Sequence, residues 1–272
     1  IKEDMGQVDL VIYSLASPRR QHPKSGEVFN STLKPIGKDV TLRGINTDKE
    51  EIQEFSLEAA NEEEIANTVA VMGGEDWQMW IDALLKADLL SANFKTIAYS
   101  YTGPKLTEPV YRRGTIGKAK NDLEKTAFTI TDLLKKIDGK AYVSVNKALV
   151  TQSSSAIPVI PLYISLLYKV MKTEGLQEGC IEQIHRLFDQ RLYLDEIPTD
   201  AEGRIRIDDW EMRANVQEQV ATLWEQATTE TLPAIGDLEG YTTEFFNLFG
   251  FNVEGIDYQK DANELVAIPS LP

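Results

Sequence analysis

The order strand, helix, strand over residues 94–150 narrows the choice of fold more than any other feature of the sequence. Two apolar runs, 94–103 and 141–150, have the length and β-branched content of buried strands. Between them, residues 114–137 repeat apolar side chains at helical spacing. Two strands joined by such a helix pair in parallel through a right-handed crossover. The sequence therefore predicts an α/β fold built on a parallel sheet.

One more strand and one more helix precede this unit. Residues 8–17, VDLVIYSLAS, have the continuous hydrophobicity of a buried parallel strand. Residues 75–90 combine an acidic first turn with an apolar face, which predicts a helix with Trp77 and Trp80 in the core. Residues 17–65 are polar and acidic, and we expect weak strands in a loop over the ends of the sheet. Because the first strand begins almost at once, we expect the chain to start inside a larger α/β domain.

The second half of the chain is predicted to be mainly helical. A small polar loop leads into a very apolar helix over 157–172, and 174–230 has largely helical periodicity. Within that segment, Asp208 or Asp209 is the predicted N-cap of a helix. The tail from residue 240 onward is aromatic and then irregular.

Composition excludes several classes of partner. The formal net charge is −15, with 28 basic against 43 acidic side chains, so non-specific binding to nucleic acid, which needs clustered cations, is not expected. The apolar run 156–168 is too short to span a bilayer, and we expect no stable membrane insertion. The single cysteine, Cys180, cannot form an intramolecular disulfide and favours a reducing cytoplasm. We expect Cys180 to be a buried structural residue on a helix.

Several kinds of catalytic site have no counterpart in the sequence. His22, His185 and Cys180 do not lie at the spacing of metal ligands, so no metal site is expected. The nucleophile-elbow and Walker A patterns are absent. No G-x-G-x-x-G follows a strand either, but a chain that starts inside a domain would have left that turn behind. A dinucleotide-binding fold is therefore still open.

Tyr111, in the segment YRRGTIGKAK, is the strongest candidate for a proton donor. The spacing between Tyr111 and Lys120 is not evidence by itself. Tyr163 and Lys172 have the same spacing, and Tyr163 is predicted to be a core residue. The context of Tyr111 carries more weight, since it follows a strand and a loop and precedes the crossover helix. That context places its hydroxyl at the carboxyl ends of parallel strands, where ligands bind in open α/β sheets.

A nearby lysine would make Tyr111 a better acid. A phenol has a pKa of about 10, and an adjacent ammonium favours the phenolate and lowers that pKa. Lys118 and Lys120 point in nearly opposite directions on a helix, so only one of them can face the site. The residues alone leave the choice between the two lysines open.

Six segments resemble trans-2-enoyl-CoA and enoyl-ACP reductases of the FabV type, in order along nearly the whole chain: IYSLASPRR (12–20), VMGGEDW (71–77), YRRGTIGKAK (111–120), VTQSSSAIPVIPLY (150–163), EGCIEQIHRLF (178–188) and RIRIDDWE (204–211). The resemblance implies a monomeric enzyme of fatty-acid synthesis. It implies reduction of the C2=C3 double bond of enoyl thioesters of CoA or acyl-carrier protein, with NADH as cofactor. It also implies that an N-terminal segment, about the first third of such a protein, precedes this chain.

The same resemblance implies a Rossmann-like fold. That fold is a doubly wound parallel sheet with helices on both faces, similar to short-chain dehydrogenases, with additional helices on the substrate side. The chain would be the C-terminal two thirds of one reductase domain over 1–272. Its expected parts are the sheet with the catalytic residues (1–156), a mostly helical part that covers the substrate (157–240) and the C-terminal tail (241–272).

Site residues follow from the resemblance position by position. The family's catalytic tyrosine and lysine have eight residues between them and match Tyr111 and Lys120, which favours Lys120 over Lys118. A second tyrosine, near the substrate carbonyl, matches Tyr101. The implied cofactor contacts are Lys120 at the ribose, Ser14, Leu15 and Ala16 on the adenosine side, and Leu149 and Thr151 near the nicotinamide.

Two other functions compete with this one. A short-chain carbonyl reductase would use Tyr101 and Lys105, which have the required four-residue offset, but the intervening TGP forbids the helix that such a pair needs. A non-catalytic acidic module for a basic partner would explain the charge of −15. It would not explain a βαβ unit with a basic patch, Arg112, Arg113, Lys118 and Lys120, at the strand ends.

Overall fold

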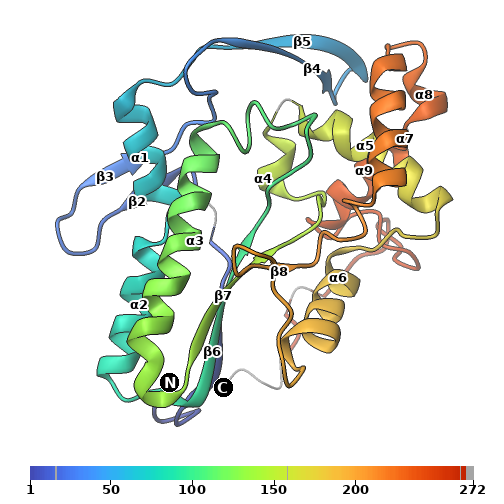
Figure 1. Cartoon of the computed structure of the whole chain (residues 1–272). Coiled ribbons are helices and arrows are strands. Elements are labelled where there is room, and N and C mark those ends of the chain that lie inside the picture. The colour runs from blue at the N-terminus through green and yellow to red at the C-terminus, as the bar shows by residue number, and fades with distance from the viewer. Residues whose placement is uncertain (16, 158, 264, 268–272) are drawn as a thin grey trace.

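A four-stranded parallel sheet is the centre of the fold. The computed structural model describes residues 1–15, 17–157, 159–263 and 265–267. The strand order is β1-β6-β7-β8, with all neighbours parallel, and β6 and β7 run through the middle of the molecule (Figure 1). The strands are β1 (Val8–Tyr13), β6 (Leu90–Ser100), β7 (Lys140–Val145) and β8 (Ile205–Arg206).

Helices lie on both sides of this sheet and provide most of the regular secondary structure in the second half of the chain (Figure 1). Their bounds are α1 (Glu62–Met72), α2 (Glu75–Lys86), α3 (Thr115–Leu133), α4 (Gln152–Ser155), α5 (Ile160–Thr173), α6 (Cys180–Leu187), α7 (Ala214–Gln226), α8 (Leu232–Ile235) and α9 (Leu238–Asn247). Two short turns continue α3 and α6, the 3-10 turn η1 (Leu134–Ile137) and the π turn η2 (Phe188–Leu192).

The βαβ unit predicted for 94–150 is confirmed. β6 and β7 pair in parallel, with Ala98 opposite Val143, and α3 connects them. α2 and α3 bury their apolar stripes on one face of the sheet. On the other face, Leu187 of α6 belongs to a cluster with Tyr99 and Tyr142 of the strands. The structure is thus an α/β fold with helices on both faces of a parallel sheet.

The predicted strand near the N-terminus is also present, but it is not fully buried. β1 pairs with β6 in parallel, with Ile12 opposite Ile97. Asp9 and Ile12 are exposed, and the Ile12 side chain keeps 39% of its surface in solvent. The prediction of a buried strand is wrong on this point, because α6 covers the second face beside β7 and β8 and leaves β1 uncovered there.

The helix predicted near Glu75 is α2, and one of its two tryptophans is core. Trp77 is fully buried and donates its indole N–H to Thr96 Oγ1 at 2.9 Å. Trp80 is 56% exposed, so its prediction as a core residue is wrong. The buried stripe of α2 follows Trp77 at helical spacing through Ile81 and Leu84, and Trp80 falls beside that stripe.

Residues 17–72 form two hairpins and a helix. The weak strands expected there are β2 (Arg19–Gln21) with β3 (Val28–Asn30), and β4 (Val40–Asn46) with β5 (Glu51–Leu57). α1 was not predicted, although its capping box is visible in the sequence. The Asn61 side chain accepts the Glu64 N–H at 2.9 Å, and the Glu64 carboxylate accepts the Asn61 N–H at 3.0 Å.

The apolar helix predicted for 157–172 is α5, which lies in the main core. Its residues from Ile160 to Tyr168 are all buried, because α7, α9 and β4 pack around it. Among the described residues, no helix has the length and hydropathy needed to cross a membrane.

Two smaller predictions in this half are wrong. α7 begins at Ala214, so neither Asp208 nor Asp209 caps it. Both carboxylates instead hold arginines, Asp208 binding Arg206 at 2.6 Å and Asp209 binding Arg186 at 2.6 Å. Cys180 is exposed at the first position of α6, so its prediction as a buried residue is wrong. The tail is as expected: its aromatic part begins in α9, which extends to Asn247, and the described residues after α9 are irregular.

Gly74 marks the closest approach of α2 to α3. Its N–H donates to Asp122 Oδ2 at 2.9 Å, and a Cβ at this position would lie 2.0 Å from Thr126 Oγ1. We expect Gly74→Ala to lower the free energy of unfolding by about 1–3 kcal/mol in chemical denaturation, because overpacking forces neighbours apart. Thr126→Gly in the same chain removes the atoms that the new methyl meets and should restore part of the loss. A double variant no more stable than Gly74→Ala would contradict this explanation.

Candidate functional site

Three strands end at the same edge of the sheet, and the predicted site residues follow them. Tyr101 comes directly after β6, and Ser14 and Leu15 come directly after β1. The segment after β7 starts with an Asn146 N–H that donates to the Ser100 carbonyl at 2.8 Å, which holds these two strand ends together. Leu15 is 65% exposed, and Ala16 lies outside the described residues. The carboxyl edge is the place where open α/β sheets bind ligands.

Tyr101 and Tyr111 lie against each other at this edge. Their ring centroids are 5.1 Å apart with an interplanar angle of 87°, an edge-to-face contact. Tyr111 is buried and ends a turn that leads into α3. Gly117 allows this arrangement, because a Cβ there would lie 2.2 Å from the Arg112 carbonyl oxygen. The glycine of the first turn of α3 therefore lets the helix pack directly on the turn that carries Tyr111.

Lys120 shares a small pocket with both tyrosines. The pocket is lined by Tyr101, Thr102, Tyr111, Arg112, Ile116, Gly117 and Lys120. Lys120 is partly buried, whereas Lys118 is exposed on the other side of α3. The structure thus brings Lys120 to Tyr111 and leaves Lys118 in solvent, as the helical spacing of the two lysines requires.

The charge states in this pocket differ from the sequence-based expectation. Burial lowers the pKa of Lys120 to about 8, although the Glu124 carboxylate one turn along acts in the opposite direction. Burial also raises the pKa of Tyr111, and the charge of Glu211 adds to that increase. The expectation that a lysine lowers the Tyr111 pKa is not met in this structure, because burial and the Glu211 charge both raise that pKa.

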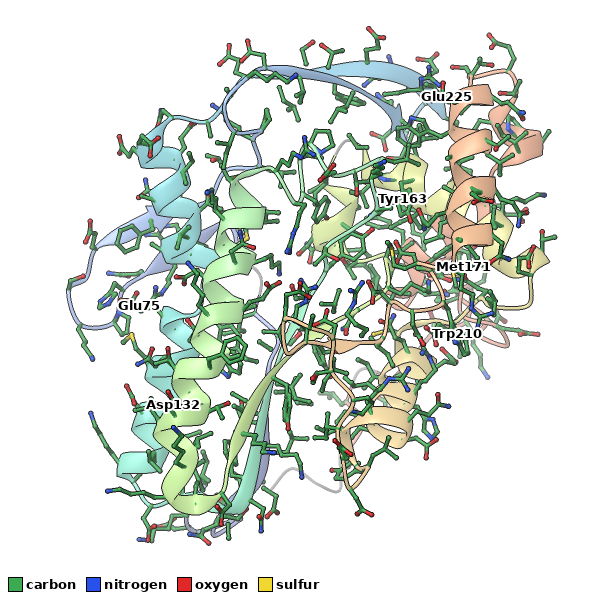
Figure 2. The ribbon with its side chains drawn as sticks, viewed as in Figure 1. Glu75, Asp132, Tyr163, Met171, Trp210 and Glu225 are labelled. Carbon is green, nitrogen blue, oxygen red and sulfur yellow. The ribbon has the colours of Figure 1, made fainter. Side chains whose placement is uncertain are left out.

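Glu211 was missed by the sequence analysis. It is fully buried, and its Oε1 accepts the hydroxyl of Tyr101 at 3.1 Å and that of Tyr163 at 2.7 Å. Its Oε2 accepts the Ala148 N–H at 2.7 Å. Tyr163 is core, as predicted, and lies among the packed side chains of α5 (Figure 2). The only sequence signal for Glu211 was its place at the end of RIRIDDWE, since its partners lie far away in the chain.

The segment after β7 carries the other two predicted cofactor contacts. Leu149 is partly buried and Thr151 is exposed. The Thr151 hydroxyl caps α4 by accepting the Ser154 N–H at 3.0 Å, and Ser154 Oγ donates to the Leu149 carbonyl at 2.9 Å. This segment is therefore held in place by its own hydrogen bonds at the carboxyl edge.

The Tyr101 and Lys105 pair of the alternative reductase is not formed. Lys105 is exposed on the turn after β6, and the Tyr101 hydroxyl bonds to Glu211 instead. Two arginines of the predicted basic patch are already paired, Arg113 with Glu108 at 3.1 Å and Arg112 with Glu124 at 3.5 Å. Within the described part of the chain, no group of three or more His, Cys, Asp or Glu side chains could hold a metal ion.

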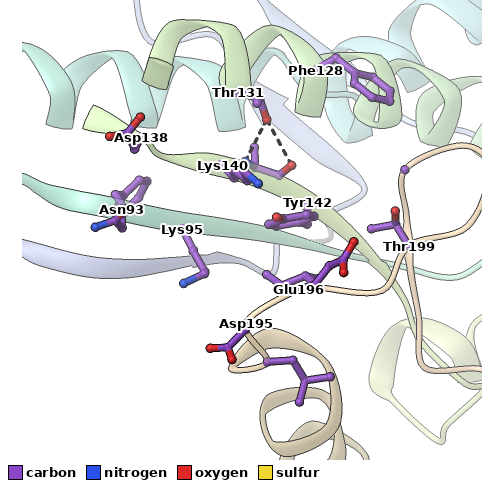
Figure 3. A pocket seen from close by; sticks show the side chains of 15 residues that line it. Asn93, Lys95, Phe128, Thr131, Asp138, Lys140, Tyr142, Asp195, Glu196 and Thr199 are labelled. Carbon is purple, nitrogen blue, oxygen red and sulfur yellow. Dashed lines mark hydrogen bonds between the residues drawn. The ribbon is translucent and has the colours of Figure 1, made fainter. Parts of the chain in front are cut away.

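A cleft also lies at the other end of the strands. It has a volume of about 530 Å³, and it opens between the amino ends of β6 and β7 and the segment 194–203 (Figure 3). Lys95, Lys140 and Glu196 line it, and Thr131 Oγ1 accepts the Ala141 N–H at 3.0 Å beside it. Because ligands of open α/β sheets bind at the carboxyl edge, this cleft is not the candidate site.

Comparison with known proteins gives two family matches. The model of the trans-2-enoyl-CoA reductase catalytic region matches residues 1–193, and a model described as the enoyl reductase FAD binding domain matches 199–262. Enoyl-(acyl-carrier-protein) reductase (NADH) of Flavobacterium psychrophilum is 64% identical over 100% of this chain and 69% of its own length. Trans-2-enoyl-CoA reductase (NADH) of Ruminiclostridium cellulolyticum is 55% identical over 100% of this chain and 69% of its own length.

Solved structures agree with these matches. The crystal structure of Clostridium acetobutulicum trans-2-enoyl-CoA reductase in complex with NAD superposes with a TM-score of 0.92 at 46% identity, over 97% of this chain and 68% of that one. The Treponema denticola trans-2-enoyl-CoA reductase in complex with NAD gives a TM-score of 0.91 at 49% identity, over 96% of this chain and 65% of that one.

The low pKa of Lys120 predicts a pH-dependent stability effect. Lys120 has a pKa of 10.5 in the unfolded chain and of about 8 in the folded chain. Below pH 8 both states carry the ammonium, and its burial lowers the free energy of unfolding. This loss of stability shrinks as the pH rises from 8 to 10.5, because the folded chain has then released the proton. We expect Lys120→Met to raise the free energy of unfolding at pH 7 by up to about 3 kcal/mol, and the gain to vanish as the pH rises through 8 toward 10.5. Lys118→Met is the control and should show no such pH dependence in urea titrations. A gain that does not change with pH would contradict the buried ammonium.

Proposed function

Because this chain belongs to the trans-2-enoyl-CoA reductase family, we propose that it reduces the C2=C3 double bond of trans-2-enoyl thioesters with NADH. The observation that carries the proposal is the pocket at the carboxyl edge of the sheet, where Tyr101, Tyr111 and Lys120 meet. Enoyl esters of CoA or acyl-carrier protein are the proposed substrates, and the saturated acyl thioester of fatty-acid synthesis is the product.

The residues at this edge fit a nicotinamide dinucleotide. A partly buried lysine that keeps most of its charge at pH 7 suits a ribose and its phosphates, and we assign that contact to Lys120. Ser14 and Leu15, exposed after β1, are the proposed adenosine contacts. Leu149 and Thr151, after β7, are the proposed nicotinamide contacts. NADH, when bound, supplies the hydride for C3 of the substrate.

The segment matched by the flavin-binding description does not fit a flavin dinucleotide. A pyrophosphate needs a glycine-bearing turn or free cations after a strand. The turn after β8 carries Asp208, Asp209 and Glu211 and has no glycine. Arg206 of that strand is paired with Asp208 at 2.6 Å. No step of the reaction is therefore assigned to a flavin.

Tyr111 is the proposed hydrogen-bond donor to the thioester oxygen. Addition of hydride at C3 moves an electron pair onto that oxygen, and a proton at C2 later completes the reduction. A donor placed at the oxygen stabilises this charge more than it stabilises the neutral substrate. The raised pKa of Tyr111 keeps its hydroxyl protonated at neutral pH. Tyr101, which packs edge-on against it, is the second proposed residue at the substrate carbonyl.

The division of the chain into parts, its oligomeric state and its location are also proposed from the family. Residues 1–156 provide three of the four strands of the sheet and the reacting groups, 157–240 add β8 and cover the substrate, and 241–272 form the tail of one reductase domain. The family resemblance supports a monomer, and the single cysteine favours the reducing cytoplasm. No G-x-G-x-x-G pattern occurs in 1–272, so no residue is assigned to a glycine-rich phosphate turn.

Replacement of Tyr111 tests the proposed donor. In the full-length protein, we expect Tyr111→Phe to lower kcat with crotonyl-CoA by about 100- to 1000-fold, because one donor to the developing charge is lost. NADH oxidation followed by absorbance measures kcat, and NADH fluorescence titration should give an unchanged Kd. A Phe variant with the turnover of the wild type would rule out Tyr111 as the donor.

Replacement of Lys120 tests the proposed ribose contact. We expect Lys120→Ala to weaken NADH binding by about tenfold or more, since a charge-assisted hydrogen bond contributes roughly 1.5–3 kcal/mol. Wild-type affinity should also fall as the pH rises through about 8, because the free protein loses the ammonium there. Lys118→Ala, on the exposed side of the same turn, is the matched control. Equal NADH affinities of the two variants would place Lys120 outside the cofactor site.

A further inference from the structure

Tyr101 and Tyr111 lie together in the pocket but differ in their hydrogen bonds. The Tyr101 hydroxyl bonds to Glu211 Oε1 at 3.1 Å. The Tyr111 hydroxyl has no hydrogen-bond partner within the described part of the chain. Two tyrosines beside one substrate oxygen can both donate a hydrogen bond to it only if neither hydroxyl proton is already bonded elsewhere. The contact with Glu211 therefore determines whether Tyr101 can donate to the substrate.

Neighbouring groups determine which proton lies where around Glu211. Gln217 donates through Nε2 to the Glu211 backbone carbonyl at 2.7 Å, and a carbonyl oxygen can only accept. The same Nε2 lies 3.1 Å from the Tyr163 hydroxyl, which therefore accepts from it. The Tyr163 proton is left for Glu211 Oε1, at 2.7 Å. Each step fixes the direction of the next hydrogen bond.

Glu211 has the surroundings of a carboxylate. The Ala148 N–H donates to Oε2 at 2.7 Å, and the Tyr163 hydroxyl donates to Oε1. Burial and, to a smaller extent, the charge of Asp208 raise the pKa of Glu211, while these two donors and the positive charge of the buried Lys147 offset part of the increase. A carboxylate can only accept hydrogen bonds, so the Tyr101 contact uses the Tyr101 proton.

We propose that Glu211 is a positioning residue of this site: its carboxylate holds the Tyr101 proton, which leaves Tyr111 as the one phenol of the pair whose proton is free for the thioester oxygen. Tyr101 then presents only its oxygen lone pairs to the pocket and supports Tyr111 through the edge-on contact of the rings. Glu211 is not itself a pocket residue. The inference rests on the proposed reductase function and assigns the two tyrosines different roles within it.

A double-mutant cycle in the full-length protein tests this role. In Glu211→Gln the amide oxygen stays on the Ala148 N–H, which turns the NH₂ toward the phenols and removes the acceptor of the Tyr101 proton. We expect kcat with crotonyl-CoA to fall by about tenfold or more, since misplaced site groups cost up to 100-fold, with NADH Kd unchanged. In a Tyr101→Phe background, Glu211→Gln should change kcat by less than about twofold, because the residue through which Glu211 acts is gone.

Tyr163→Phe is the matched control for the cycle. Its hydroxyl bonds to the same oxygen of Glu211, but Tyr163 is fully buried and does not line the pocket. We expect the tenfold effect of Glu211→Gln to persist in this background. An effect of the same size in the Tyr101→Phe and Tyr163→Phe backgrounds would show that Glu211 only supports the fold. A Glu211→Gln protein with wild-type kcat would also overturn the proposal.

Two further measurements keep the outcome decisive. If Glu211→Gln does not fold, as judged by NADH binding and thermal melting, Glu211→Asp takes its place in the cycle, because it keeps the charge and shortens the reach to Tyr101. A wild-type protein that binds NADH but does not oxidise it with crotonyl-CoA would contradict the proposed function itself. If the wild-type protein is active but Glu211→Gln and Tyr101→Phe change kcat independently of each other, only the positioning role of Glu211 is contradicted.

Discussion

Parallel hydrogen bonding of β6 to both of its neighbours is the constraint on which the site depends. β6 pairs with β1 and with β7 in parallel, with Tyr13 opposite Ala98 and Ser100 opposite Val145. The three strands therefore end at one edge, and the segments that follow them meet there. Each of those segments carries proposed site residues, although they are separated by more than 130 positions between Ser14 and Thr151.

Burial removes the charged groups at this edge from water, and their neighbours offset this desolvation to different extents. Glu211 is fully buried, and a donor to each oxygen offsets part of its desolvation, which still raises its pKa. The buried Lys120 ammonium is also only partly compensated, by the charge of Glu124, and burial lowers its pKa to about 8. A poorly solvated ammonium gains more from an anionic ligand than a hydrated one does, which is consistent with a cofactor contact at Lys120.

The sequence predicted those features that depend on local periodicity and chain order. The βαβ unit, the position of Tyr111 at the strand ends and the apolar helix α5 all follow from patterns within about 60 residues. Trp80 and Asp208 were not predicted correctly in this way. The exposure of Trp80 depends on where the apolar stripe of α2 ends, and Asp208 pairs with Arg206 of β8 while α7 begins only at Ala214. Glu211 contacts Tyr101 from 110 positions away, and no periodicity reports such a contact.

The Glu211 carboxylate joins the helical half of the chain to the reacting groups. One of its oxygens bonds both to Tyr163, in the first turn of α5, and to Tyr101, directly after β6. Its other oxygen holds the backbone of the segment after β7 at Ala148. A shift of α5 relative to the sheet would therefore move the acceptor of the Tyr101 proton. Because core packing resists such shifts, the packing of α5 determines the geometry of the pocket as well as the stability of the fold.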